Sequence, residues 1–120
     1  MLLIAIGIVG FAILVRVGWW AYNQIPDQYD SFARCLKDKD VAFYGAYWCP
    51  ACQSQKALFG RSQRLLPYKE CARFIGSGMR QSCVDAGIER FPTWEFADKS
   101  RQEGVLTFDD LTAKTGCVVE

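Results

Sequence analysis

Residues 41–60 read VAFYGAYWCPACQSQKALFG, and this stretch decides the fold. Its first part, residues 41–48, is apolar almost throughout and rich in aromatic side chains, which is typical of a strand buried on both faces. The letters CPAC at 49–52 follow at once, and their proline favours the first turn of a helix that residues 53–59 continue. The stretch therefore predicts a buried strand followed directly by a helix that starts at two cysteines.

Two cysteines three positions apart across a helix start are suited to reversible disulfide exchange. We expect Cys49 to be the attacking thiolate, because unpaired N–H groups and the helix dipole stabilise negative charge at that end. Cys52, one turn further in, is then the thiol that attacks the mixed disulfide and releases the partner. The alternative is half of a zinc site. Because the sequence contains no second CxxC and no histidine, redox exchange is favoured.

The sequence around this unit alternates between helical and strand patterns. Asp30 or Ser31 is expected to cap a first helix, and Thr107 with Asp110 forms a capping box that starts a last helix. The elements expected between them are a strand over 68–71, a short helix around 80–86, a strand over 93–97 and a partner strand after a turn at 98–100. This order predicts an α/β fold with at least one βαβ unit.

The segment from Met1 to Tyr22 is apolar and long enough to cross a membrane. Residues 1–15 carry no charged side chain, and Arg16 is followed by the interfacial aromatic residues Trp19, Trp20 and Tyr22. As a helix, this segment would span about 33 Å, close to the hydrocarbon thickness of roughly 30 Å. A cleaved signal peptide is the alternative, but no small-x-small cleavage pattern follows. We therefore expect an uncleaved signal anchor at 1–22, a linker at 23–30 and one domain at 31–120.

Composition and charge exclude several classes of function. The chain of 120 residues contains no histidine, which excludes every mechanism that needs an imidazole. After residue 26, 13 basic and 13 acidic side chains balance, so no nucleic-acid partner is expected. A local excess of basic residues at 56–80 is interpreted as a solvated face. Six cysteines in so short a chain indicate an oxidising compartment, so we place the domain outside the cytoplasm.

Residues 43–52, FYGAYWCPAC, resemble the active site of the thioredoxin fold. They are most similar to thioredoxin-like domains fused to, or acting with, bacterial vitamin K epoxide reductase homologues. The resemblance covers roughly Phe32 to Cys117, and the other segments that carry it are Gln55-Lys56, Phe59-Gly60, 68–71, 83–88 and 91–94. It implies a thioredoxin-like fold, a central mixed sheet flanked by helices, preceded here by one N-terminal transmembrane helix. It also implies thiol-disulfide oxidoreductase activity, and neither a cofactor nor a metal is expected.

The resemblance further implies roles for individual residues. Cys49 is the nucleophile, Cys52 is the resolving thiol, and Pro92 is the cis-proline beside the pair. The active-site neighbours that it implies are Trp48, Pro50, Ala51, Phe91 and Thr93. From the residues alone, Pro92 indicates only the start of a strand.

The partners implied by the resemblance are secreted or periplasmic protein thiols and a quinone-linked membrane oxidoreductase. The implied location is the bacterial cytoplasmic (inner) membrane, crossed once, with the thioredoxin-like domain on the extracytoplasmic side. Two departures leave the direction of electron flow open. Phe43 stands where many members hold a buried acid, and Pro50-Ala51 stands where many strong oxidants have a histidine. Alternative interpretations are a reductase for cytochrome or copper-site maturation, and a non-catalytic binding or scaffold protein with a structural disulfide.

Four cysteines remain outside the CxxC pair, and they allow three pairings. The resemblance supports a disulfide between Cys71 and Cys83, which bracket a glycine-containing loop. Cys35 and Cys117 would then join the first helix to the end of the chain. A buried unpaired thiol is the alternative for Cys35, and a second electron-relay pair is the alternative for Cys71 and Cys83.

Overall fold

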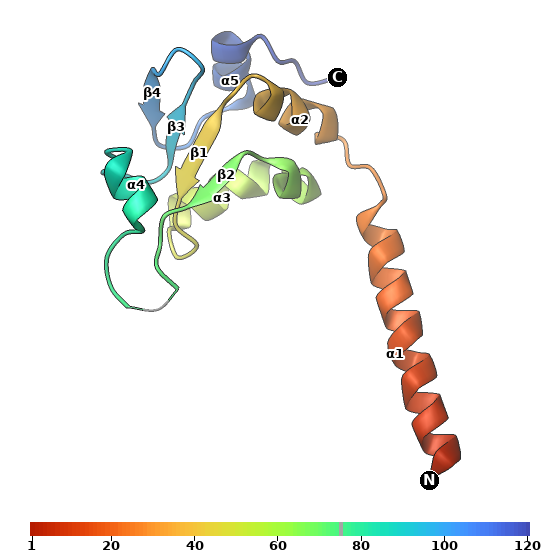
Figure 1. The fold of residues 1–120 in the computed structure, drawn as a ribbon. Coiled ribbons are helices and arrows are strands. Elements are labelled where there is room, and N and C mark those ends of the chain that lie inside the picture. Colours follow the sequence, from red (N-terminus) through yellow and green to blue (C-terminus); the bar gives the residue numbers. More distant parts are fainter. Residues whose placement is uncertain (75) are drawn as a thin grey trace.

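The computed structural model describes residues 1–74 and 76–120, and Figure 1 shows an α/β domain from which one long helix projects. The helices are α1 (Leu2–Asn23), α2 (Asp30–Asp38), α3 (Pro50–Leu58), the 3₁₀ helix η1 (Gly60–Leu65), α4 (Gln81–Asp85) and α5 (Phe108–Thr115). The strands are β1 (Ala42–Gly45), β2 (Tyr68–Glu70), β3 (Thr93–Glu95) and β4 (Arg101–Glu103). This arrangement confirms the predicted thioredoxin-like fold, with helices around a mixed sheet and one apolar helix before it.

The strands that the structure describes form one sheet in the order β2-β1-β3-β4. β1 pairs in parallel with β2 and antiparallel with β3, and β3 pairs antiparallel with β4. The predicted βαβ unit is therefore β1, α3 and β2. β1 ends at Gly45, earlier than the apolar run to residue 48 predicts, because the chain turns and the Cys49 N–H donates to the Ala46 carbonyl at 3.1 Å. The turn at residues 46–49 therefore places the start of α3 at the end of β1, which lies between β2 and β3 in the sheet.

Side chains that alternate along β1 and β3 divide the core into two layers. Phe43 and Trp94 point to one face, with their rings stacked at a centroid distance of 4.5 Å. The side chains that cover this face include Phe32, Leu36, Phe59 and Leu111. Ala42 and Tyr44 belong to the opposite layer, together with Cys71, Cys83 and Ile88. β1 is thus buried on both faces, as its apolar sequence predicts.

A buried glutamine fixes α3 against the sheet. Gln55 is fully buried, and its side-chain oxygen accepts hydrogen bonds from the Trp94 indole N–H at 3.2 Å and the Leu106 N–H at 2.7 Å. Its amide nitrogen donates to the Leu106 carbonyl at 3.0 Å. Leaving such a buried group without partners costs about 1–3 kcal/mol, so this network holds the helix that carries the CxxC pair in one position.

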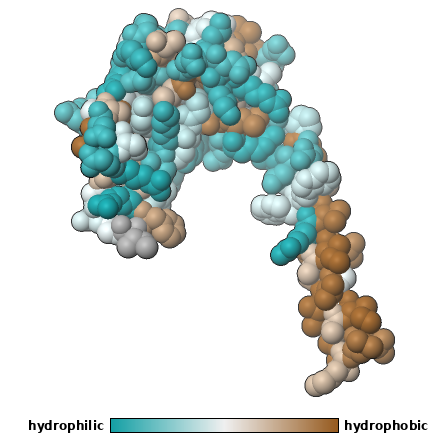
Figure 2. Space-filling model, in the orientation of Figure 1, coloured by the Kyte–Doolittle hydropathy of each residue, from teal (hydrophilic) through white to brown (hydrophobic). Residues whose placement is uncertain are grey.

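α1 is apolar and lies outside the domain. It has 22 residues, an 18-residue window of mean hydropathy 2.3, and no buried residue. Figure 2 shows its surface as hydrophobic along most of its length, whereas the visible face of the domain is mainly hydrophilic. The helix is long and apolar enough to cross a membrane, which suggests an anchor, although a signal sequence near an N-terminus has the same properties.

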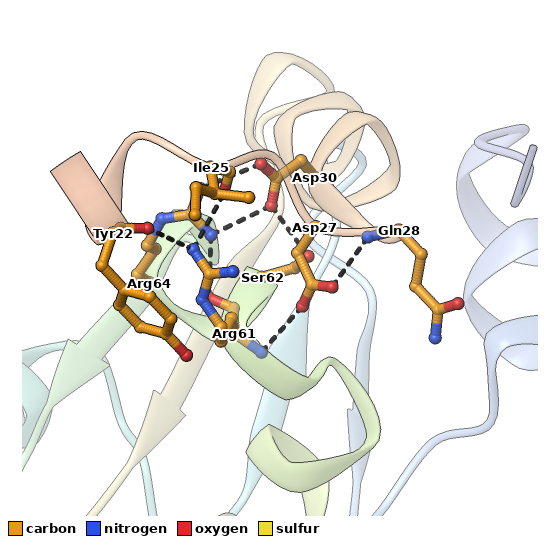
Figure 3. A network of polar contacts seen from close by, with 8 residues as sticks. All are labelled: Tyr22, Ile25, Asp27, Gln28, Asp30, Arg61, Ser62 and Arg64. Atoms are coloured by element: carbon orange, nitrogen blue, oxygen red, sulfur yellow. Dashed lines mark hydrogen bonds and ion pairs between the residues drawn. The ribbon is translucent and has the colours of Figure 1, made fainter.

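Polar contacts join the end of α1 to the domain, as Figure 3 shows. The Arg61 guanidinium donates to the carbonyl oxygens of Tyr22 at 2.9 Å and Ile25 at 2.8 Å, and it lies over the Tyr22 ring. The Arg61 backbone N–H donates to the Asp27 carboxylate at 3.0 Å. The interpretation of the basic residues at 56–80 as a solvated face is therefore wrong for Arg61.

The start of α2 also differs from the prediction. Neither Asp30 nor Ser31 caps this helix, which begins at Asp30 after Tyr29 and has no side-chain cap. The Asp30 carboxylate instead accepts hydrogen bonds from the Arg64 guanidinium at 2.9 and 3.0 Å and from the Ser62 hydroxyl at 2.8 Å. These contacts, Arg64 first, lower the pKa of Asp30 to about 2. The carboxylate therefore ties α2 to η1.

Candidate active site

The CxxC pair lies at the N-terminus of α3. Cys49 is the N-cap residue of this helix, and Cys52 lies in its first turn. Both are free thiols, Cys49 with 7% of its surface exposed and Cys52 fully buried. Backbone N–H groups without partners at a helix N-terminus favour negative charge. The helix therefore presents one sulfur at its start and holds the second behind it.

The neighbours expected from the sequence meet around Cys49. Pro50 is exposed at the first helical position, Ala51 is half-buried, and the Trp48 side chain is 58% exposed. The Cys49 Sγ lies 3.9 Å from the Phe91 carbonyl oxygen. The rings of Trp48 and Phe91 meet edge to face, with centroids 6.1 Å apart. Trp48 and Phe91 thus flank the more accessible sulfur.

The segment from Phe91 to Thr93 leads into β3. The Phe91–Pro92 peptide bond is cis, and Pro92 is fully buried. Phe91 packs against the buried cluster that contains Cys49 and Cys52. Thr93 is buried in the sheet, and its hydroxyl donates to the Arg90 carbonyl at 2.6 Å. Of these residues, Phe91 touches the CxxC pair and Thr93 belongs to the sheet behind it.

Burial makes Cys52 a weak acid. Loss of solvation for its thiolate raises the pKa of Cys52 to about 12, and the neighbouring Cys49 acts in the same direction. A backbone hydrogen bond from Ala46 and the charge of Lys56 oppose this effect. Cys52 is therefore a protonated thiol at neutral pH, and an attack by it needs a group that takes the proton.

The groups on the inner side of Cys52 were not predicted as site residues. A Cβ placed on Gly45 would stand 3.0 Å from Cys52 Sγ and 2.9 Å from a ring carbon of Tyr68. Glu70 accepts a hydrogen bond from the Tyr68 hydroxyl, and Lys56 Nζ lies 3.6 Å from the centroid of the Tyr68 ring. The two-residue spacing of Tyr68 and Glu70 in a predicted strand is the one signal that points to this pair.

The remaining four cysteines form two disulfides. Cys71 and Cys83 are bonded across a separation of 12 residues, and both are buried. Cys35 and Cys117 are bonded across 82 residues and join α2 to the segment after α5. Within residues 1–74 and 76–120, no three Cys, Asp or Glu side chains are grouped so as to hold a metal ion.

Comparison with known proteins finds similarity to a protein named as a redox enzyme. Thiol-disulfide oxidoreductase LTO1 of Arabidopsis thaliana is 37% identical to this chain over 90 residues, which cover 72% of the chain and 24% of that relative. The chain thus spans about a quarter of the length of this curated relative. No protein-family model matches the chain. The chain is therefore a thioredoxin-like homologue of a thiol-disulfide oxidoreductase, which supports an enzyme of the oxidoreductase class.

Proposed function

We propose that this protein is a membrane-anchored thiol-disulfide oxidoreductase that acts outside the cytoplasm through Cys49 and Cys52. The observation that carries the proposal is the pair itself: two free thiols at the start of α3, one with 7% of its surface exposed and one fully buried, in a chain whose other cysteines are paired. The 37% identity to a protein named as a thiol-disulfide oxidoreductase supports the same class of reaction.

In the proposed direction, the Cys49–Cys52 disulfide accepts two electrons from a protein dithiol. A partner thiolate attacks Cys49 Sγ, the Cys49–Cys52 bond breaks, and Cys52 leaves as a thiolate that takes up a proton. The second partner thiolate attacks the partner sulfur of the mixed disulfide and releases Cys49. The partner leaves with a new disulfide, and the pair is left reduced. Attack falls on Cys49 because Cys52 has no exposed surface.

A cavity that Trp48 and Phe91, the two aromatic residues flanking Cys49, help to line supports a polypeptide partner. It has a volume of about 340 Å³, and its lining includes Trp48, Met79 and Phe91 together with Arg73. Aromatic and thioether side chains adapt to different apolar groups, so this lining suits protein thiols of varied sequence. We propose that the segment flanking the partner cysteine lies here.

Reoxidation of the pair requires an electron acceptor, and we propose a quinone-linked membrane protein of the vitamin K epoxide reductase type. The resemblance of residues 43–52 to domains that act with such proteins supports this partner. α1 supports a tether, and two proteins held in one membrane meet more often without any new contact. The two disulfides favour the oxidising side of the membrane, and the same resemblance favours the bacterial cytoplasmic membrane.

Trapping in cells tests both the roles and the partner. Because Cys52→Ala removes the resolving thiol, this variant should accumulate mixed disulfides through Cys49, which are identified by mass spectrometry after non-reducing purification. The double variant Cys49→Ser/Cys52→Ala is the control and should trap nothing. We expect secreted proteins and a quinone-linked membrane oxidoreductase among the trapped proteins, each captured when the Cys49 thiolate attacks one of its disulfides.

Two results would contradict this proposal. If Cys52→Ala traps nothing and Cys49→Ser retains exchange, the assignment of the two cysteines is wrong. If only a cytochrome-maturation or copper-loading protein is trapped, the domain works as a reductase and the oxidative direction is wrong.

A further inference from the structure

Exchange by the CxxC pair needs a route for the proton of the buried thiol. Cys52 is fully buried, so its proton has no direct path to solvent. The position from which many thioredoxin-fold proteins supply a buried acid holds Phe43, whose ring stacks on Trp94 and accepts no proton. Another group beside Cys52 therefore has to accept the Cys52 proton.

Tyr68 occupies the neighbouring position on the adjacent strand. Phe43 of β1 pairs with Tyr68 of β2, and the two ring centroids are 5.1 Å apart. Gly45 faces the same side as Phe43, because side chains alternate along a strand. A Cβ on Gly45 would stand 3.0 Å from Cys52 Sγ and 3.3 Å from Tyr68 Oη. The thiol and the hydroxyl therefore border a small space that glycine leaves open.

Glu70 extends this arrangement towards solvent. It lies two residues after Tyr68 on the same face of β2, and it accepts a hydrogen bond from the Tyr68 hydroxyl. Its other carboxylate oxygen accepts from the Tyr47 backbone N–H at 2.9 Å. Glu70 is only half-buried, so part of this residue is exposed to solvent. A series of groups thus leads from the buried sulfur to an accessible carboxylate.

The ionisable groups around Cys52 indicate different roles for Tyr68 and Glu70 in proton transfer. The titratable groups that face it are Cys49 and Lys56 on the α3 side, and Tyr68 and Glu70 on β2. Burial first, and Glu70 second, raise the pKa of Tyr68 above its usual range. Tyr68 therefore keeps its proton at neutral pH and is suited to pass a proton on, whereas the carboxylate of Glu70 is the acceptor.

We propose that Tyr68 and Glu70 form a proton relay for Cys52, a role that rests on the proposed exchange reaction. In a mixed disulfide between Cys49 and a partner, the Cys52 proton moves to Tyr68 Oη, through one bridging water where Cys52 Sγ and Tyr68 Oη are not in contact. At the same time the Tyr68 proton moves to Glu70. The Cys52 thiolate attacks Cys49 Sγ, the bond to the partner breaks, and the electron pair leaves on the partner sulfur. Cys49 and Cys52 are oxidised, the partner is reduced, and Glu70 releases its proton to solvent.

Single-turnover kinetics with glutathione disulfide as the probe separate the two steps. The reduced full chain in detergent micelles first forms a Cys49–glutathione disulfide, and Cys52 then displaces glutathione. Acid quenching and mass spectrometry measure both rates. We expect Tyr68→Phe and Glu70→Gln to slow the second step at least about tenfold near neutral pH and the first less than about twofold, because general acid–base groups contribute typically 10²–10⁴-fold.

Controls separate a relay from a structural role. Glu70→Gln keeps an oxygen that accepts from Tyr47 and Tyr68→Phe keeps the ring, and thermal unfolding checks that both variants fold. Glu103→Gln, on the exposed edge of β4, is the matched control and should keep both rates. The second-step rates of the relay variants should approach the wild-type rate as the pH is raised, because hydroxide then takes the Cys52 proton.

The outcomes distinguish the relay from the exchange reaction on which it rests. If the wild-type protein reacts with glutathione disulfide and the relay variants have the same second-step rate at neutral pH, the relay alone is overturned. Slowing by the same factor at every pH also overturns the relay, since a loosened structure gives that result. Wild-type protein that forms no mixed disulfide overturns the proposed function and the relay with it.

Discussion

At the scale of single residues, the proposed exchange depends on two identical side chains in different surroundings. Cys49 lies at the start of α3 with part of its surface exposed, whereas Cys52 is fully buried and its pKa is raised to about 12. Both cysteines belong to the buried cluster with Ala46 and Ala72, but one helical turn separates them and only Cys49 keeps some exposed surface. The proposed roles of nucleophile and resolving thiol therefore follow from burial.

A single carboxylate at the junction of α2 and η1 should give the protein a specific acid sensitivity. The pKa of Asp30 is lowered to about 2, chiefly by Arg64, so Asp30 stabilises the folded state above the ordinary carboxyl pKa near 4 and loses this effect as the pH falls towards 2. Because Arg64 is partly exposed, Asp30→Asn should lower the free energy of unfolding by about 1 kcal/mol at pH 7. Urea denaturation between pH 2 and pH 7 measures the difference.

The matched control for this measurement is Asp38→Asn, which removes an exposed carboxylate from the other end of α2. Asp38→Asn should not reproduce the pH-dependent loss. A difference between wild type and Asp30→Asn that stays constant from pH 7 to pH 2 would show that Arg64 does not stabilise the charged carboxylate.

Local patterns predicted residue contacts only where both partners are close in sequence. The capping box of Thr107 and Asp110 forms as predicted, because its partners lie within one helical turn. Asp30 meets residues 32 and 34 positions away, and strand pairing brings Tyr68 beside Gly45. Contacts of this kind depend on tertiary packing, so no local pattern indicates them.

At the scale of elements, the unit β1-α3-β2 positions the site. β1 ends at the turn before Cys49, Gln55 ties α3 to the core, and β2 pairs in parallel beside them. The apolar run and the CPAC letters predicted this unit. η1 was missed because residues 60–65, GRSQRL, have no apolar periodicity, and contacts from Ser62 and Arg64 to Asp30 hold them. Elements marked by an apolar pattern, a turn or a cap were therefore predictable, whereas η1, which long-range polar contacts hold, was not.

The disulfide between Cys71 and Cys83 should stabilise the fold without taking part in exchange. Because it constrains the unfolded chain, its replacement by serine at both positions should lower the free energy of unfolding by about 3 kcal/mol and leave thiol exchange largely intact. Removing Cys35 and Cys117 in the same way should cost more, about 4 to 5 kcal/mol, because that loop is longer. Denaturant titration and glutathione exchange assays measure the two effects.

One combination of results would contradict this assignment. Unchanged stability together with lost turnover, after replacement of Cys71 and Cys83, would make this pair a second electron relay.

At the scale of the whole molecule, an apolar helix without buried residues is joined to a folded redox domain. The Arg61 contacts with Tyr22 and Ile25 bring the domain against the end of α1. If α1 crosses a membrane, this junction keeps the domain close to the membrane surface. The length and composition of residues 1–22 predicted α1. The contacts at the end of α1 come from Arg61 in η1, and no local sequence pattern predicted them.

The position of the domain relative to the membrane is open to direct labelling. The mature protein should retain residues 1–22, and residues from about Asn23 onward should lie on the oxidising side. Mass measurement of the mature chain and alkylation of Cys49 with a membrane-impermeant maleimide in intact cells test these two points. A mature N-terminus near Ala21 would contradict the retained anchor. Labelling of Cys49 only after the cells are permeabilised would contradict the predicted side of the membrane.

The reduction potential of the Cys49–Cys52 pair is the most direct test of the central claim, that these two thiols form an exchangeable redox pair. The full chain is equilibrated in glutathione buffers of known ratio, and the oxidised fraction is measured by alkylation and mass spectrometry. A disulfide that oxidises other proteins should lie above about −270 mV, towards about −200 mV, because no histidine stands between the cysteines. A potential below about −300 mV, with no exchange on addition of glutathione, would show that the pair is a structural disulfide.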